Sequence, residues 1–217
     1  VKQYEESSYA RQVAKHLKTE HHELMVEPSA VEVLPSLAQH YDEPFSDSSC
    51  IPTWYVAQFT REHVTVAVSG DGGDELFAGY PRYKAIDLGH KIDRITPLKF
   101  LLTLPQIQKI LPYGSKYKGF FPRLKRFLRS LHYSPAYRYL DWINIFPYAN
   151  RLQFYTDEFQ SCLEDHDPAE FITQAWQLAA NRSPISKASL GDLVTYLPCD
   201  LNTKVDIASM AHSLECR

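Results

Sequence analysis

One short stretch combines glycines and carboxylates at a density that suits phosphate or cation chemistry. Four of the chain's eight glycines lie in the stretch 69–80, which reads Ser-Gly-Asp-Gly-Gly-Asp-Glu-Leu-Phe-Ala-Gly-Tyr. Glycines let the backbone turn sharply and approach a ligand closely. Asp71, Asp74 and Glu75 crowd three carboxylates into five positions, which is costly unless a cation or a charged substrate neutralises them. We therefore expect the chemistry of this chain here.

The residues before this stretch predict the element that positions it. The apolar run 64–68, Val-Thr-Val-Ala-Val, indicates a buried parallel strand. Ligands of open α/β sheets bind beyond the carboxyl ends of such strands. The spacing of the glycines matches neither the dinucleotide fingerprint nor the Walker loop. The alternative interpretation is a tight strand-to-helix turn whose acids only favour the positive end of the next helix.

Helices and strands alternate in the first part of the chain. Apolar spacing predicts helices over about 8–17, 29–41 and 52–63, with a short strand over 22–26. This alternation predicts an α/β fold, in which helices flank part of a parallel sheet. Beyond about residue 86 the pattern is mainly helical, with prolines as breaks.

Composition excludes several classes of protein. The 217 residues are 44% hydrophobic and 23% charged, which is typical of a globular chain and not of a disordered one. Four cysteines without C-x-x-C spacing indicate neither a zinc site nor a disulfide framework, and favour a reducing cytoplasm. Because no apolar run approaches the roughly 18 residues that span a bilayer, we expect no membrane partner.

A basic segment could bind an anionic partner. Residues 94–140 contain ten Lys and Arg and neither Asp nor Glu, although the whole chain has a net charge of −3. One interpretation is a helical module that binds RNA. The other is a solvated face that also balances acidic neighbours, and few aromatic residues are interleaved for stacking on bases. We favour the second interpretation and expect no nucleic-acid partner.

Three further positions carry competing interpretations. Lys204 is either a surface lysine or a phosphate contact. The stretch Asp47-Ser48-Ser49 is more typical of a helix start than of a catalytic group. His212 is more typical of a packed or surface histidine than of a ligand.

Three stretches together carry a family resemblance. Residues 42–49, 64–80 and 204–217 resemble, in this order, motifs of the synthetase domain of glutamine-hydrolysing asparagine synthetases. The resemblance implies a PP-loop ATP pyrophosphatase fold, similar to the adenine nucleotide alpha hydrolases. It divides the chain into a partial nucleotide-binding core over 1–85 and a mainly helical part over 86–217, whose last helix returns to the active site. It also implies a PP-loop upstream of Val1 and an N-terminal glutaminase domain in the same protein.

The resemblance also implies a reaction and the residues that perform it. ATP would activate the side-chain carboxylate of aspartate as an acyl-adenylate, with release of pyrophosphate, and ammonia from glutamine would then displace AMP. Ser69 and Gly70 would contact the nucleotide, and Asp74 would bind Mg²⁺ together with the triphosphate. Asp71 would accept a proton as ammonia attacks, and Glu75 would support the catalytic site.

One position departs from the family pattern. Ile207 stands where many members carry a basic residue that meets phosphate, so Lys204, one turn earlier, is the substitute candidate for nucleotide binding. We expect this fragment to be inactive by itself. An unpaired sheet edge would also allow two copies to associate as a homodimer. The alternatives are a related amidotransferase or a β-lactam synthetase-like ligase with another acyl substrate, and the RNA-binding module.

Overall fold

The chain folds into two compact units. A computed structural model describes residues 7–25, 29–104, 106–107, 119–146, 150, 153–163, 167 and 169–217. The units consist of Val1–Ser69 with Lys204–Arg217, called the strand unit below, and Gly70–Thr203, called the helical unit. The division at residue 85 that the sequence predicts for the synthetase domain stays a prediction.

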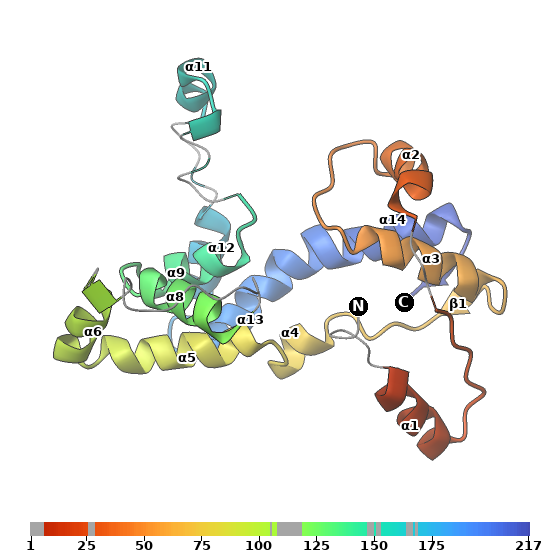
Figure 1. Ribbon diagram of the computed structural model, residues 1–217, viewed down its shortest axis with the longest axis horizontal. Helices are drawn as coiled ribbons and strands as arrows, with labels where there is room; N and C mark the ends of the chain where they lie inside the picture. Colours follow the sequence, from red (N-terminus) through yellow and green to blue (C-terminus); the bar gives the residue numbers. More distant parts are fainter. Residues whose placement is uncertain are drawn as a thin grey trace. The chain divides into compact units, whose positions relative to one another are not determined.

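The strand unit contains the elements that precede the glycine-rich turn and the end of the chain. Its elements are α1 (Ser7–Leu17), α2 (Ala30–Tyr41), α3 (Cys50–Arg61), β1 (Val66–Ala67), α14 (Thr203–Ala211, from its second residue) and β2 (Glu215–Cys216) (Figure 1). The three predicted helices are confirmed. The predicted strand over 22–26 is wrong for its described part, because residues 22–25 have no regular secondary structure and Val26 lies outside the described residues.

The strand before the glycine-rich turn is parallel, as predicted, but short and exposed. Val66 pairs with Glu215 and Ala67 with Cys216, so the partner strand comes from the far end of the sequence. The amide of Arg217 donates to the carbonyl of Ala67 at 2.9 Å. The predicted burial is wrong, since Val66 is 45% and Val68 is 87% exposed. In the described chain β2 is the one neighbouring strand, which leaves the other edge of β1 unpaired.

Apolar side chains of three helices form the core of the strand unit. Tyr41 of α2 is buried, and its hydroxyl donates to the carbonyl of Lys204 at 3.1 Å. His212 packs edge-on against Trp54, with ring centroids 4.5 Å apart, which confirms the interpretation of a packed histidine. The buried core residues are Val33, Leu37, Tyr41, Cys50 and Trp54, with Ile207 and Ala211 of α14 packed against them.

The helical unit confirms the mainly helical character predicted beyond residue 86. Its elements are α4 (Gly73–Phe77), α5 (Pro81–Asp93), α6 (Thr96–Thr103), α8 (Phe120–Ser130), α9 (Pro135–Ile143), α11 (Asp157–Ser161), α12 (Glu170–Leu178), α13 (Pro184–Val194) and the π-helix η2 (Leu197–Asn202) (Figure 1). Proline at the first position suits α5, α9 and α13, because an amide there would have no partner within the helix. Among the described helices none is both long and apolar enough to cross a bilayer.

Helix α13 lies at the centre of the helical unit. It contacts α4, α5, α12 and η2, and α9 packs against α5 and α12. The largest buried cluster joins these helices through Tyr83, Ile86, Tyr139, Ile172, Trp176 and Ala188. The N-terminal end of α5, which directly follows the glycine-rich turn, is therefore held by helices from much later in the sequence.

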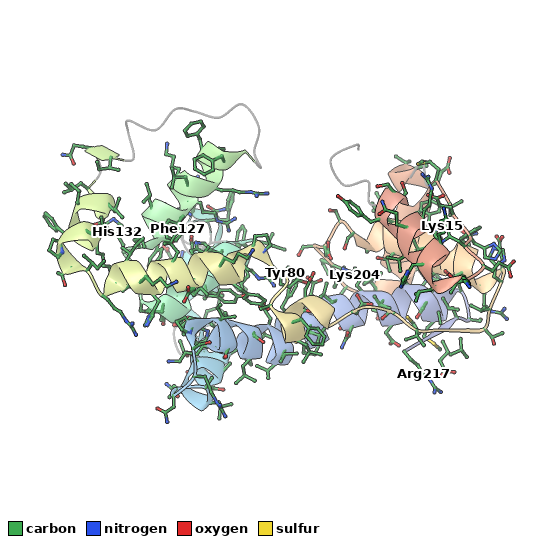
Figure 2. All side chains as sticks on the ribbon, turned by 90° about the horizontal axis from the view of Figure 1, so that it is seen from below. Lys15, Tyr80, Phe127, His132, Lys204 and Arg217 are labelled. Carbon is green, nitrogen blue, oxygen red and sulfur yellow. The ribbon has the colours of Figure 1, made fainter. Side chains whose placement is uncertain are left out.

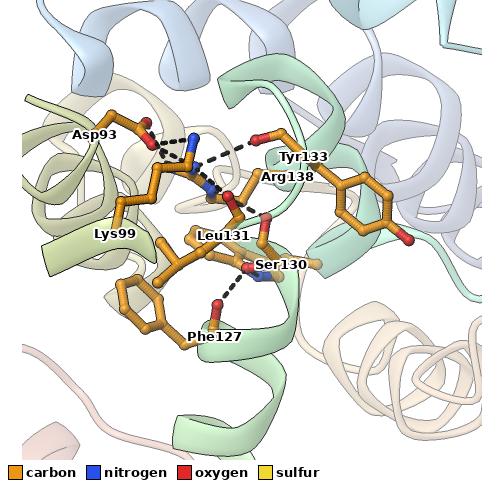
Figure 3. Close-up of polar contacts among 8 residues, drawn as sticks. Asp93, Lys99, Phe127, Ser130, Leu131, Tyr133 and Arg138 are labelled. Atoms are coloured by element: carbon orange, nitrogen blue, oxygen red, sulfur yellow. Dashed lines mark hydrogen bonds and ion pairs between the residues drawn. The ribbon is translucent and has the colours of Figure 1, made fainter. Parts of the chain in front are cut away.

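A second cluster fixes the other end of α5 (Figure 3). The guanidinium of Arg138 on α9 is fully buried and binds both carboxylate oxygens of Asp93, at 2.9 and 3.0 Å. Lys99 of α6 adds a second cation at 2.9 Å from the same carboxylate. Burial alone would raise the pKa of Asp93, but the hydrogen bonds from Arg138 and Lys99 outweigh it and lower this pKa. The charged residues thus join α5, α6 and α9.

Candidate active site

The glycine-rich turn begins with a backbone conformation that favours glycine. Gly72 has φ of +84° and caps the N-terminus of α4, and L side chains rarely adopt such a φ. A Cβ at Gly72 would lie 3.4 Å from Leu197 of η2, which is an ordinary contact, so the backbone conformation and not the available space favours glycine here. Apart from the neighbouring residues and the backbone of α4, no atom of the described chain lies within 4 Å of a Cβ built at Gly70 or Gly73. The backbone conformation at Gly72 therefore explains why one of the clustered glycines is present.

The three clustered acids occupy two environments. Asp71 and Asp74 are exposed, whereas Glu75 is only 1% exposed. Gly79 leaves room for Asp74, since a Cβ at Gly79 would lie 2.9 Å from Cγ of Asp74 and closer still to its Oδ1. The backbone closes the same turn, because the amide of Gly79 donates to the carbonyl of Asp74 at 2.9 Å. Two of the acids thus face solvent, and the third faces the protein interior.

Glu75 is hydrogen-bonded within the helical unit. The hydroxyl of Tyr80 donates to its Oε1 at 2.7 Å, and the hydroxyl of Ser189 on α13 donates to its backbone carbonyl at 2.7 Å. Burial, together with the carboxylate of Glu75, raises the pKa of Tyr80, so the phenol stays a donor at neutral pH. Tyr80 precedes α5 directly (Figure 2). Tyr80 therefore links Glu75 to the start of α5, which suits a residue that fixes the glycine-rich turn.

A buried polar network, which the sequence did not predict, contacts this turn through Tyr80. Arg82 stacks on the ring of Tyr80, with its guanidinium carbon 3.7 Å from the ring centroid. The same guanidinium binds Oδ2 of Asp192 at 2.8 Å, and the Asp192 carboxylate is 0% exposed. Tyr83 donates to this oxygen at 2.6 Å, and Tyr139 also donates to it. Arg82 and Tyr83 follow the glycine-rich turn closely in sequence, but Asp192 has no local sequence signal.

The residues predicted to contact the nucleotide fall in both units. Ser69 ends the strand unit, and its amide donates to the carbonyl of Arg217 at 2.8 Å, so this amide already has a partner. Gly70 begins the helical unit, and its carbonyl accepts from the amide of Gly73 at 3.2 Å. The open space around Gly70 leaves room for a ligand to approach its backbone.

Lys204 is not the surface lysine that one interpretation of the sequence predicted. It is 7% exposed, and its ammonium donates to Oδ2 of Asp47 at 2.7 Å and to the hydroxyl of Ser49 at 2.8 Å. Burial alone would raise the pKa of Asp47, but hydrogen bonds from Lys204 and Ser49 lower it. The amide of Ser49 donates to Oδ1 of Asp47 at 2.9 Å, which confirms that this stretch starts α3. Phosphate binding by Lys204 stays a prediction.

The exposed carboxylates fit a site for Mg²⁺. This ion usually takes one or two protein carboxylates and completes its octahedron with phosphate oxygens and water. Asp74, with its carboxylate against Gly79, and the exposed Asp71 supply such donors. No group of three or more His, Cys, Asp or Glu residues suited to a metal occurs in the described part of the chain. The chemistry of these donors suits an ion that arrives with a phosphate substrate.

The basic segment is neutralised in part by the acids that flank it. Arg138 and Lys99 bind Asp93, immediately before the segment, and Arg129 binds Asp141, immediately after it. Arg126 donates to the carbonyl of Asp141 at 2.7 Å. These contacts favour the interpretation that the positive charges balance neighbouring acids.

Comparison with known proteins identifies the family. The family described as Asparagine synthase matches residues 1–217. Glutamine-hydrolyzing asparagine synthetase 1 of Bacillus subtilis is 29% identical over 216 residues, which cover 99% of this chain and 32% of that protein. A provisionally named glutamine-hydrolyzing asparagine synthetase 2 of Methanocaldococcus jannaschii is 41% identical over 114 residues, which cover 52% of this chain and 20% of that protein.

The chain thus spans about a third or less of the length of these relatives. No solved structure was found to match it. The family match extends over the whole sequence, including the glycine-rich turn, the buried network and the returning C-terminal strand. The chain therefore belongs to the asparagine synthase family.

Proposed function

We propose that this chain is the synthetase part of an ATP-dependent ligase that converts aspartate to asparagine. Family membership and the names of the relatives support this activity. The observation that carries the proposal is the arrangement of Asp71 and Asp74, which are exposed on a glycine-rich turn directly after a parallel strand. Ligands of α/β proteins bind at this end of such strands.

In the proposed reaction an oxygen of the aspartate side-chain carboxylate attacks the α-phosphorus of ATP. Pyrophosphate leaves, and an acyl-adenylate forms. The nitrogen of ammonia then attacks the acyl carbon, the bond to the AMP oxygen breaks, and Asp71 accepts a proton from the nitrogen. Mg²⁺, when bound, would neutralise phosphate charge, and Asp74 is the residue proposed to hold it.

The remaining site residues have supporting roles in this proposal. The backbone at Ser69 and Gly70 would contact the AMP part of the nucleotide. The ammonium of Lys204 is bonded to Asp47, so it would have to leave this carboxylate to contact a phosphate directly. Otherwise Lys204 would contribute to nucleotide binding indirectly, by holding the residues that start α3. Glu75 would act as a positioning residue, because its carboxylate is buried against Tyr80.

The proposal also concerns the parts of the protein that relatives carry beyond this chain. A PP-loop would hold the pyrophosphate part of ATP, and a glutaminase domain would supply ammonia. The reactions would take place in the cytoplasm. These assignments rest on family membership and on the share of the relatives that the chain covers.

Pyrophosphate release by the intact protein tests the proposal. The protein is incubated with ATP, Mg²⁺ and ammonia, together with aspartate, glutamate, or a β-amino acid that could close to a lactam. We expect pyrophosphate and AMP in equal amounts with aspartate only, and asparagine as the amide product. Release that requires another carboxylate would identify a related ligase instead and refute the assignment of aspartate.

A further inference from the structure

Asp192 of α13 accepts hydrogen bonds from three side chains of the helical unit, although it is far in sequence from the glycine-rich turn. Its carboxylate is fully buried, and three donors converge on one oxygen, Oδ2: Arg82, Tyr83 and Tyr139. Oδ1 has no partner among the described residues. A buried carboxylate is stable only when it is paired and hydrogen-bonded, so the position of Arg82 is closely tied to that of Asp192.

Arg82 transmits this constraint to the turn. Its guanidinium stacks on the ring of Tyr80, and the hydroxyl of Tyr80 binds the carboxylate of Glu75. Glu75 lies next to Asp74 in α4, a helix of only five residues. Such a short helix has little stability of its own, because most of its amides and carbonyls lack partners within it. Contacts with other elements must therefore fix it.

Helix α13 supplies a second anchor to the same turn. Ser189, three residues before Asp192, donates its hydroxyl to the carbonyl of Glu75 at 2.7 Å. We propose that Asp192 is a positioning residue of the active site, which acts through Arg82, Tyr80 and Glu75 to fix the turn that carries Asp71 and Asp74. This inference rests on the proposed function for its catalytic consequence, whereas the mechanical coupling stands on the contacts alone.

Two conservative variants in the intact protein test the coupling. Asp192→Asn keeps the shape of the side chain and removes the charge that holds Arg82. Tyr80→Phe keeps the ring under Arg82 and removes the bond to Glu75. Hydrogen exchange of the amides of Leu76 and Gly79, which bond within the turn, should become at least about tenfold faster in both variants. The double variant should exchange no faster than the more affected single variant, because both substitutions interrupt one chain of contacts.

Asp93→Asn is the matched control. It also removes a carboxylate that binds a buried arginine in the helical unit, but Asp93 is partly exposed and lies at the other end of α5. It should speed exchange around Arg138 and leave the amides of Leu76 and Gly79 unchanged. Unchanged exchange at these two amides in both Asp192→Asn and Tyr80→Phe would overturn the inference, as would equal acceleration by Asp93→Asn.

Kinetics test the catalytic consequence separately. For asparagine synthesis from ammonia, Asp192→Asn should lower kcat about 10- to 100-fold, raise the Mg²⁺ concentration at half-maximal rate, and change the KM for aspartate little. Asp93→Asn should alter none of these values. A fully active Asp74→Asn variant would refute the proposed function. A fully active Asp192→Asn variant beside an inactive Asp74→Asn variant would refute only the positioning role.

Discussion

Replacing Gly89 by alanine tests how tightly the buried Arg138 is packed, because the substitution either raises or lowers the free energy of unfolding. Alanine is about 1 kcal/mol more favourable than glycine inside a helix, so an unobstructed substitution in α5 would stabilise the protein. A Cβ at Gly89, however, would lie 2.5 Å from Nη1 of Arg138 and 3.4 Å from its Cζ. The guanidinium is fully buried and cannot move aside without weakening its two bonds to Asp93.

The expected magnitude follows from these opposing effects. Breaking a buried ion pair costs about 3 to 5 kcal/mol. After the gain of about 1 kcal/mol in helix propensity, Gly89→Ala should lower the free energy of unfolding by about 2 to 4 kcal/mol. Urea denaturation of the intact protein, followed by tryptophan fluorescence, measures this change. Trp142 is a suitable reporter, because its indole donates to Ser130 beside the Arg138 cluster.

Gly191→Ala is the matched control within α13. It is also a buried glycine inside a helix, but its Cβ would meet Ile172 and Trp176 only at 3.6 and 3.7 Å, which are ordinary contacts. We expect it to be neutral or slightly stabilising. If Gly89→Ala were as stable as Gly191→Ala, the account of Arg138 as a fixed, tightly packed residue would be refuted.

Three further substitutions or conditions have defined outcomes. Gly79→Ala should displace the Asp74 carboxylate and raise the Mg²⁺ requirement of asparagine synthesis, with an activity loss of at least about tenfold; an unchanged Mg²⁺ titration would contradict this. Lys204→Met should cost about 1 to 3 kcal/mol in urea denaturation, because it leaves the partly exposed carboxylate of Asp47 without its cation. Adding Asp47→Asn should recover part of the loss, and an additive double variant would show that the pair is not coupled. Burial lowers the pKa of His212, so the unfolded chain takes up a proton more readily, and stability should fall as pH drops below about 6.5; the decline should become shallower in His212→Phe.

The sequence located the glycine-rich turn because its signal is local. Clustered glycines and acids lie within a dozen residues, and the structure gives Gly72 a positive φ and Gly79 a close contact with Asp74. The different burial of Glu75 could not be predicted, since it depends on Tyr80 and on Ser189, 114 residues away. Spacing alone does not show which of several neighbouring carboxylates faces the interior.

Long-range polar partners account for most of what the sequence analysis missed. Asp192 and Arg82 are separated by 110 residues, and Lys204 and Asp47 by 157, so no local pattern connects them. The partner strand β2 consists of Glu215 and Cys216, which carry little β-propensity signal.

The Asp71→Asn variant of the intact protein tests the central claim most directly. Asp71 is proposed to act only when ammonia attacks the acyl-adenylate, after pyrophosphate has formed. Aspartate-dependent exchange of labelled pyrophosphate into ATP should therefore survive in Asp71→Asn, while the rate of asparagine formation from ammonia should fall by about 10² or more. Asparagine formation at the wild-type rate would contradict the proposed role of this exposed carboxylate.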